Sequence, residues 1–400
     1  MTPLKKKVLW IAVVILLVAV TALTTFAVTV TQLSARLSAA ADPVTAKLSE
    51  LAQYIDLYFI DDYDEAALTA AAADGAASAM VAATGDRWSY YISAEDMAAH
   101  NEQLYNEYVG IGIVIQVTDG GMEVTSVTEG GPAEAAGVLV GDILTEVDGE
   151  ATDALGLDET KNRVRGEAGT TVELTFLRDG AEVALTVERA AIVSPVAEAE
   201  LLEGNIGYIT IANFDYHCAE QTLACIDEMA AQGAEALLFD VRFNPGGLKD
   251  EMVEILDTLL PEGDIFRSVD YAGREEVDTS DAACLELPMA VLVNEDSYSA
   301  AEFFAAALQE YGVAEVVGVQ TSGKGNFQYT FNLSDGSAVA LSVGKYYTPS
   351  GKSLTDVGIV PDVEADLSYA DYEALYYGTL PLDEDAQVQA ALEVLREKIS

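Results

Sequence analysis

Residues 289–325 read MAVLVNEDSYSAAEFFAAALQEYGVAEVVGVQTSGKG. Two apolar runs, MAVLVN and AEVVGV, enclose a helix candidate at Ala300–Tyr311, so the stretch predicts strand, helix, strand. The same alternation begins at Ile206, with IGYITI, a helix at Ala219–Gln232, ALLFDV, and a helix at Leu248–Leu260. Continuous apolar strands that alternate with helices indicate a mostly parallel sheet covered on both faces. The predicted fold class is therefore an α/β core, to which FQYTFNL and AVALSVG add a β-hairpin.

Three polar loops follow strands of this predicted sheet. They are RFNPGG at residues 242–247, SYS at residues 297–299 and SGKG at residues 322–325. In open α/β sheets, sites form beyond the carboxyl ends of the strands. We therefore expect the three loops to share one edge of the sheet.

Ser299 has two compatible interpretations. With Glu302 three residues later it forms a helix capping box, and capping alone explains a serine at this position. A serine at a strand-to-helix turn also lies where helix amides stabilise an oxyanion, and as a nucleophile it needs a base. His100 and His217 are the only histidines, and neither falls in a loop at this sheet edge, so a Ser–His–Asp protease of the trypsin type is disfavoured.

Lys324 is the candidate base. A lysine can accept a proton only when burial or hydrogen bonding keeps it neutral, and no acid lies between Glu315 and Asp335. Gly318 to Lys324 also spells the start of a phosphate-binding loop, G-x-x-x-x-G-K. Gly325 stands where that loop needs a Ser or Thr for magnesium, so nucleotide binding is not predicted.

The N-terminus predicts a membrane anchor. Lys5, Lys6 and Lys7 precede an uncharged run of 23 residues, Val8 to Val30, which as a helix is ~34 Å long against a ~30 Å hydrocarbon core. The lysines favour a cytoplasmic N-terminus and an exported remainder. The alternative is a signal peptide cleaved near residues 39–41, although its apolar core would be unusually long.

Composition excludes several classes of function. The chain has 67 acidic residues against 20 Lys and Arg, a formal net charge of −47, which should repel nucleic acid. Cys218, Cys225 and Cys284 form no C-x-x-C pair and no cluster with histidine, so neither a metal site nor a disulfide framework is predicted. No cofactor is indicated.

The predicted organisation has five parts. The region from 35 to 100 reads as helical with a break at residues 85–88, whereas residues 109–190 form short β-type runs with helices at Pro132–Ala136 and Leu157–Arg165. The parts are a cytoplasmic stub and transmembrane anchor (1–31), a helical segment (32–105), a β-rich module (106–190), the α/β core (191–368) and a helical tail (369–400).

The chain resembles the C-terminal processing peptidases, also called tail-specific proteases, over residues 85–365. GDRWSYYIS resembles the segment before the PDZ domain of that family, and YVGIGIVI and GGPAEAAGVLVGDILTEVDG resemble the PDZ domain itself. DVRFNPGG, SYSAAEFFAAALQEYG, VGVQTSGKGNFQ and YYTPSGKSLTDVGIVPDV then follow in the order and spacing of the family. The sequence departs from the family at Tyr298, Ala301 and Phe243, none of which removes a catalytic group.

The resemblance implies that residues 106–190 are a PDZ domain and residues 191–368 a protease core, and it assigns roles to matching residues. It implies Ser299 as nucleophile, Lys324 as base and Gln328 as the residue that orients the lysine; in other members an acid at the position of Glu310 has that part. The oxyanion donors fall on the backbone amides of Gly246 or Gly247 and of Ala300. The amides around Gly110, Ile111, Gly112 and Ile113 would capture a free C-terminus, and Arg165 would couple this ligand to activation.

The implied function is that of a membrane-anchored serine endopeptidase, with its catalytic domain outside the cytoplasm. Its partners would be proteins or peptides with free apolar C-termini, and the family implies homodimerisation through the terminal helical segments. The alternative is a non-catalytic protein of the same fold that binds peptide tails with its PDZ domain without cleaving them.

Overall fold

The computed structural model describes residues 21, 25, 43–118 and 120–399. Contacts divide the chain into two compact units, residues 1–85 and residues 86–400. The first unit contains the helices α2 (Pro43–Tyr58) and α3 (Glu65–Ala82), which have no buried side chains. Apart from residues 21 and 25, the predicted anchor at 8–30 lies outside the described residues, and no helix among the described ones is long and apolar enough to cross a membrane.

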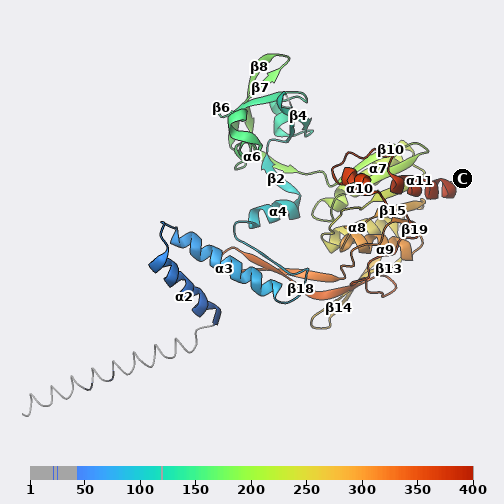
Figure 1. The fold of residues 1–400 in the computed structure, drawn as a ribbon. Coiled ribbons are helices and arrows are strands. Elements are labelled where there is room, and N and C mark those ends of the chain that lie inside the picture. Colours follow the sequence, from blue (N-terminus) through green and yellow to red (C-terminus); the bar gives the residue numbers. More distant parts are fainter. Residues whose placement is uncertain (1–20, 22–24, 26–42, 119, 400) are drawn as a thin grey trace, which may run out of the picture. The chain divides into compact units, whose positions relative to one another are not determined.

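A six-stranded, mostly parallel sheet organises the second unit (Figure 1). The strands β11, β12, β15, β16 and β19 run parallel, and β10 pairs antiparallel with β11 at one edge. The predicted parallel α/β core is thus confirmed. In sheet order the strands are β10 (Ala197–Leu202), β11 (Ile206–Ile211), β12 (Ala236–Asp240), β15 (Met289–Val293), β16 (Ala314–Gly318) and β19 (Val363–Glu364).

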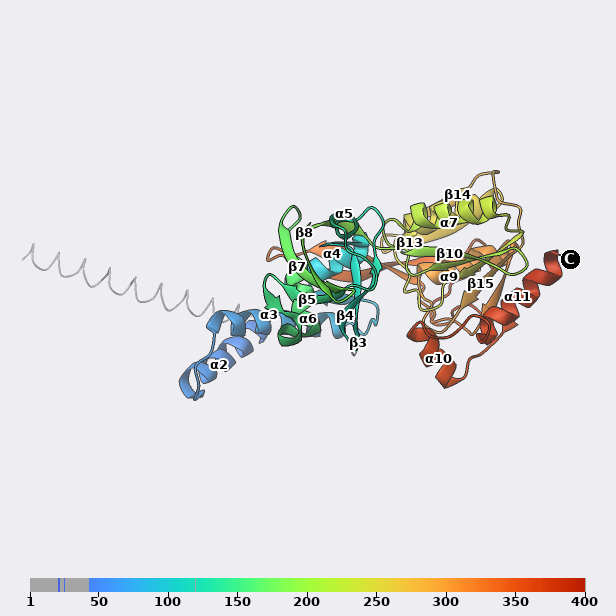
Figure 2. The same cartoon turned by 90° about the horizontal axis from the view of Figure 1, so that it is seen from above.

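Helices cover both faces of this sheet, as its apolar strands require. Alternate residues of β12 show the division: Leu237 and Phe239 belong to the core under one helical layer, and Leu238 to the core under the other. Each large side chain buried in this way contributes about 1.5–3 kcal/mol. One layer consists of α7 (Cys218–Gln232), α8 (Lys249–Leu259) and α9 (Ala300–Glu310), and the other of α11 (Ala386–Ile399), which lies along β15 and β16 (Figure 2).

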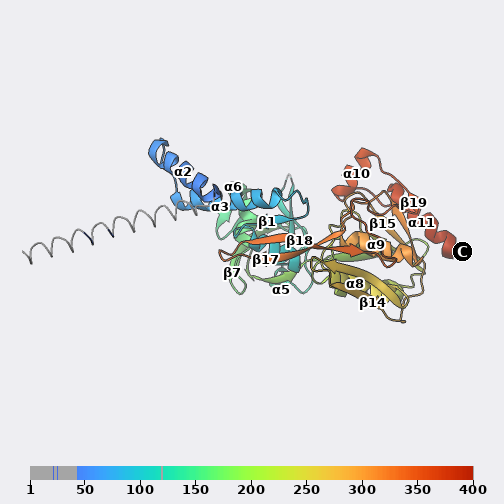
Figure 3. The ribbon, with the colours of Figure 1, turned by 90° about the horizontal axis from the view of Figure 1, so that it is seen from below.

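A second, antiparallel sheet carries the predicted hairpin and three strands that the sequence did not predict (Figure 3). The expectation of helix around residue 91 was wrong, because Tyr90–Ile92 pairs with the hairpin. The stretch between α8 and β15, for which the sequence analysis gives no element, contains two strands, one of them the acidic sequence EEVDTS. The strands are β1 (Tyr90–Ile92), β13 (Gly263–Asp270), β14 (Glu275–Ser280), β17 (Asn326–Asn332) and β18 (Ala338–Tyr347).

The β-rich module has the two helices that the sequence predicted. The helix α5 spans Pro132–Ala136, and α6 spans Thr152–Val164 with a kink at Gly156, whose φ is 76°. Its sheet contains β3 (Ile113–Thr118), β4 (Gly121–Val127), β5 (Ile143–Val147), β6 (Glu150–Ala151), β7 (Thr171–Arg178) and β8 (Ala181–Glu188). The remaining elements are the paired strands β2 (Glu107–Gly110) and β9 (Ala190–Val193) and the helices α4 (Met97–Tyr105) and α10 (Tyr369–Tyr376).

A buried ion cluster anchors the loop that follows β12. The Arg242 guanidinium donates to Asp240 and, at 2.7 Å, to Asp385 Oδ2, which lies just before α11. Gln387 Oε1 accepts a further hydrogen bond from Arg242. Breaking a buried pair of this kind typically costs about 3–5 kcal/mol. The C-terminal helix and the polar loop are therefore held by the same side chain.

Candidate active site

The three polar loops meet at one edge of the sheet, as the alternation of strands predicted. Their strands β12, β15 and β16 are parallel neighbours, so their carboxyl ends lie side by side. The backbone N–H of Tyr298 donates to Asn244 O, and that of Ser322 to Ser297 O. The middle loop is thus hydrogen-bonded to both of its neighbours.

Ser299 occupies the turn from β15 into α9 with a strained backbone. Its backbone angles, φ of 59° and ψ of −125°, lie in a region that residues other than glycine rarely adopt. Such a conformation costs about 1–3 kcal/mol. The capping box predicted from the sequence is present, because Ser299 N–H donates to Glu302 Oε2 at 3.0 Å. A capping role alone does not require this backbone strain.

Glu302 connects the serine turn to the lysine loop. Its side chain is fully buried and accepts hydrogen bonds from the backbone N–H groups of Ser299, Gly323 and Lys324, and from the Thr321 hydroxyl. Burial raises its pKa, although these hydrogen bonds oppose the shift. The sequence analysis treated Glu302 only as part of a cap. A single acid among the apolar residues of AAEFFAAAL was the signal that could have revealed this role.

Lys324 is placed in a largely apolar, aromatic environment. Its Nζ lies 5.1 Å from the centroid of the Trp88 ring and 5.6 Å from that of Tyr298. Burial lowers its pKa, and the negative charges of Glu302 and Asp86 only partly oppose this. Within residues 43–118 and 120–399, no hydrogen bond joins its Nζ to Ser299 or to Gln328. The surroundings favour a neutral amine, the form that a general base requires.

The glycine loop packs against the serine turn, and each of them provides a candidate oxyanion donor. A Cβ on Gly246 would lie 2.7 Å from Ser299 Cβ and 2.8 Å from Ala300 N, so the loop and the turn are in close contact. Gly246 N–H donates to Asn244 Oδ1 at 2.8 Å. The N–H groups of Gly247 and Ala300 have no acceptor in the described parts of the chain. Between the two glycine donors considered from the sequence, this geometry favours Gly247.

The two candidates for orienting the lysine lie in different surroundings. Gln328 Nε2 donates to Ser342 Oγ at 3.0 Å and to Asn326 O at 3.3 Å. Glu310 accepts from Thr348, Ser350 and Lys352, which hold it in a turn and lower its pKa against the opposing effect of burial. Glu310 is therefore engaged away from the lysine, whereas the Oε1 atom of Gln328 keeps its acceptor capacity.

A groove in the β-rich module coincides with the predicted carboxylate-binding loop. It has a volume of about 310 Å³ and lies between that loop and α6. Arg165 at its rim forms an ion pair with Glu102 at 2.8 Å and lies over the Tyr108 ring at 5.2 Å. Residues from both walls line it: Tyr108, Gly110, Ile111, Gly112, Ile113, Val114, Ile115, Leu157, Lys161, Val164 and Arg165.

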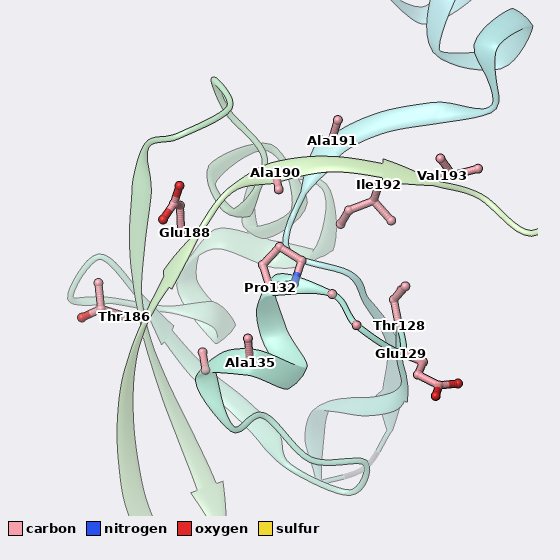
Figure 4. Close-up of a pocket in the computed structure, with 13 residues that line it drawn as sticks. Thr128, Glu129, Pro132, Ala135, Thr186, Glu188, Ala190, Ala191, Ile192 and Val193 are labelled. Atoms are coloured by element: carbon pink, nitrogen blue, oxygen red, sulfur yellow. The ribbon is translucent and has the colours of Figure 1, made fainter.

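A larger hollow, of about 670 Å³, lies elsewhere in the module, between α5 and the segment from β8 to β9 (Figure 4). Pro132 and Ala135 face Ile192 across it, and Glu129 and Glu188 lie at its margin. None of the candidate catalytic residues lines this hollow. Its polar side chains, which include the carboxylates of Glu129 and Glu188, are separate from the loops that meet at the sheet edge, so the sheet-edge site stays the candidate place of chemistry.

Comparisons with known proteins match these two regions. The family model described as peptidase family S41 matches residues 205–365, and a PDZ domain model matches residues 123–178. A carboxy-terminal processing protease of Bacillus subtilis, CtpA, is 32% identical over 307 residues, which are 76% of this chain and 66% of that protein. A carboxyl-terminal-processing protease of Synechocystis is 35% identical over 295 residues, 72% of this chain and 68% of that protein.

A solved structure shares the fold. The crystal structure of a Bacteroides fragilis protein described as an S41 protease is 19% identical, with a TM-score of 0.50, and the match covers 79% of this chain and 88% of the other. The relatives from Bacillus and Synechocystis are longer than the matched region, which spans about two thirds of their length.

Proposed function

The chain belongs to peptidase family S41, among the relatives of the carboxy-terminal processing proteases, and from this premise we propose that it is a serine endopeptidase with Ser299 as nucleophile and Lys324 as general base. The observation that carries the proposal is the convergence of three loops. Glu302 fixes the Ser299 turn and the Lys324 loop to one carboxylate, and the glycine loop packs against the serine.

The proposed reaction is acyl transfer to water. Neutral Lys324 takes the proton of the Ser299 hydroxyl, and the oxygen attacks the scissile carbonyl. The amides of Ala300 and Gly247 then bind the oxyanion; each such donor is typically worth a factor of about 10²–10³ in rate. Lys324 returns the proton to the leaving amine, and water releases the acyl group. Gln328 orients the lysine through its Oε1 atom.

Substrate capture is assigned to the PDZ groove. Backbone amides of Gly110, Ile111 and Gly112 provide the type of nest that binds a terminal carboxylate. The apolar walls of the groove support a preference for apolar C-terminal residues, and Arg165 couples the bound tail to activation. The domain division given from the sequence and a homodimer through the terminal helical segments belong to the same proposal.

The proposed location is the cell membrane, with the catalytic domain outside the cytoplasm. It rests on the run of 23 uncharged residues, Val8 to Val30, behind three lysines. Protease accessibility of the chain in intact spheroplasts tests this orientation. If residues after the apolar run were protected from the added protease in intact spheroplasts, the proposed orientation would be wrong.

Cleavage of an unstructured protein that ends in apolar residues tests the activity. The full chain in detergent is incubated at mildly alkaline pH beside its Ser299→Ala and Lys324→Ala variants, and the fragments are identified by mass spectrometry. We expect cleavage by the wild type alone. Equal cleavage by Lys324→Ala would place the base elsewhere, and tail binding without cleavage by the wild type would favour the non-catalytic peptide-binding protein.

A further inference from the structure

Asp86, in the segment before β1, is the centre of a polar cluster beside the lysine. It accepts the Ser89 hydroxyl on Oδ2 at 2.5 Å and the backbone N–H of Trp88 on Oδ1 at 3.2 Å. The Ser342 hydroxyl also hydrogen-bonds to its carboxylate. Burial alone would raise the pKa of Asp86, but these hydrogen bonds hold it below the usual range, so the group is an anion at neutral pH.

Ser342 joins this anion to Gln328. Gln328 Nε2 donates to Ser342 Oγ at 3.0 Å, while the backbone N–H of Ser342 donates to Ser89 Oγ at 2.9 Å. A hydroxyl has a single hydrogen, which Ser342 gives to the ionised Asp86. Its oxygen can then only accept from the Gln328 amide. This order of donors fixes the Gln328 amide with Nε2 toward Ser342 and leaves Oε1 as its free acceptor.

We propose that Asp86 is a positioning residue of the Ser299–Lys324 pair, which acts through Ser342 to present Gln328 Oε1 to the lysine. The inference rests on the proposed function and extends it to a residue that contacts neither the serine nor the substrate. A reversed amide would present two donors to an ammonium or amine group, which gains little from them.

The charges around Lys324 decide the direction of the electrostatic effect. Glu302 on α9 and Asp86 are the anions that act on the Lys324 ammonium. The lysine Nζ also lies over the rings of Trp88 and Tyr298. The Arg87 guanidinium lies 4.3 Å from the centroid of the same Trp88 ring. Burial lowers the pKa of Lys324, and Asp86 opposes this. Removing the Asp86 charge must therefore lower the lysine pKa further, so that deprotonation occurs at lower pH.

The test compares pH profiles of kcat/KM for the wild type, Asp86→Asn and Ser342→Ala, each as the full chain in detergent. For Asp86→Asn we expect the rise of kcat/KM with pH to occur at lower pH than in the wild type. The plateau value of kcat/KM should fall roughly 3- to 10-fold, the factor that one hydrogen bond supplies. Ser342→Ala should lower the plateau by a similar factor without moving this rise. Asp96→Asn is the matched control and should leave both unchanged, because it removes an exposed acid between β1 and α4 that likewise accepts a serine hydroxyl, that of Ser93.

Asp86→Glu keeps the negative charge, so its kcat/KM should rise over the same pH range as that of the wild type. This second variant keeps the inference testable if Asp86→Asn does not fold. An unshifted rise in Asp86→Asn, or an unchanged plateau in Ser342→Ala, would overturn the inference while the proposed protease stood. A wild type whose serine is not labelled by a fluorophosphonate would overturn the proposed function, and the role of Asp86 with it.

Discussion

The sheet-edge site and the PDZ groove differ in how firmly their parts are held. At the sheet edge, Ser299, the glycine loop and the Lys324 loop are joined by hydrogen bonds that converge on the buried Glu302 and on Asn244. In the PDZ groove, the side chain at the rim, Arg165, is about 40% exposed, and so is its partner Glu102.

The difference matches the demands of the two tasks. Acyl transfer requires a nucleophile and oxyanion donors that are positioned before the reaction begins. Capture of a flexible tail tolerates movement, because backbone amides and apolar walls accept many side chains. Substitutions at the sheet edge should therefore have large effects on the rate, and substitutions at the rim of the groove small ones.

The largest effect is expected for Gly246→Ala. The added Cβ would lie 2.7 Å from Ser299 Cβ at a φ of 88°, so the serine turn or the oxyanion donors must move. We expect cleavage to fall by about 10³-fold or more, in line with the loss of an oxyanion donor. Gly204→Ala is the matched control, because its φ is 90° but its Cβ would meet nothing within 4 Å. Equal losses in both variants would mean that backbone strain alone explains the effect.

An intermediate effect is expected for Glu302→Gln. An amide offers one acceptor oxygen where the carboxylate accepts four hydrogen bonds, so buried N–H groups lose their partners at about 1–3 kcal/mol each. Both the unfolding midpoint in urea and kcat should fall. Glu295→Gln removes an exposed acid of the preceding loop and should change neither. A Glu302→Gln variant with full activity would show that the two loops do not depend on this carboxylate.

The smallest effect is expected for Arg165→Ala. An exposed ion pair contributes about 0–1 kcal/mol, and the contact with Tyr108 adds a similar amount. The apparent KM for a peptide tail should rise and kcat should fall, each by only a few-fold, because Arg165 contributes both to binding of the tail and to its coupling with activation. Arg163→Ala, which breaks ion pairs with Glu150 of β6 and Glu159 of α6, serves as control. A much larger fall of kcat in Arg165→Ala would instead mean that this residue at the rim of the groove is essential for activation.

The meeting of the three loops could be predicted from sequence, because apolar strands that alternate with helices determine where loops emerge. Strand β14 could not, since EEVDTS has no apolar period and is a strand only through its pairing with β13. The roles of Glu302 and Asp86 also escaped prediction. Their partners lie up to 22 and 256 residues away in the chain, so the sequence could mark Glu302 as an unusual acid among apolar residues but could not identify what either carboxylate contacts.

The central claim is that Lys324 in its neutral form activates Ser299, and the pH dependence of acylation tests it most directly. The burst rate with a chromogenic ester is measured against pH for the wild type and Lys324→Ala. The account predicts that the wild-type rate rises with a midpoint below the ordinary lysine pKa of 10.5, because burial lowers that of Lys324, and that this rise disappears in Lys324→Ala. The same rise in both proteins would contradict it and assign the base to another group.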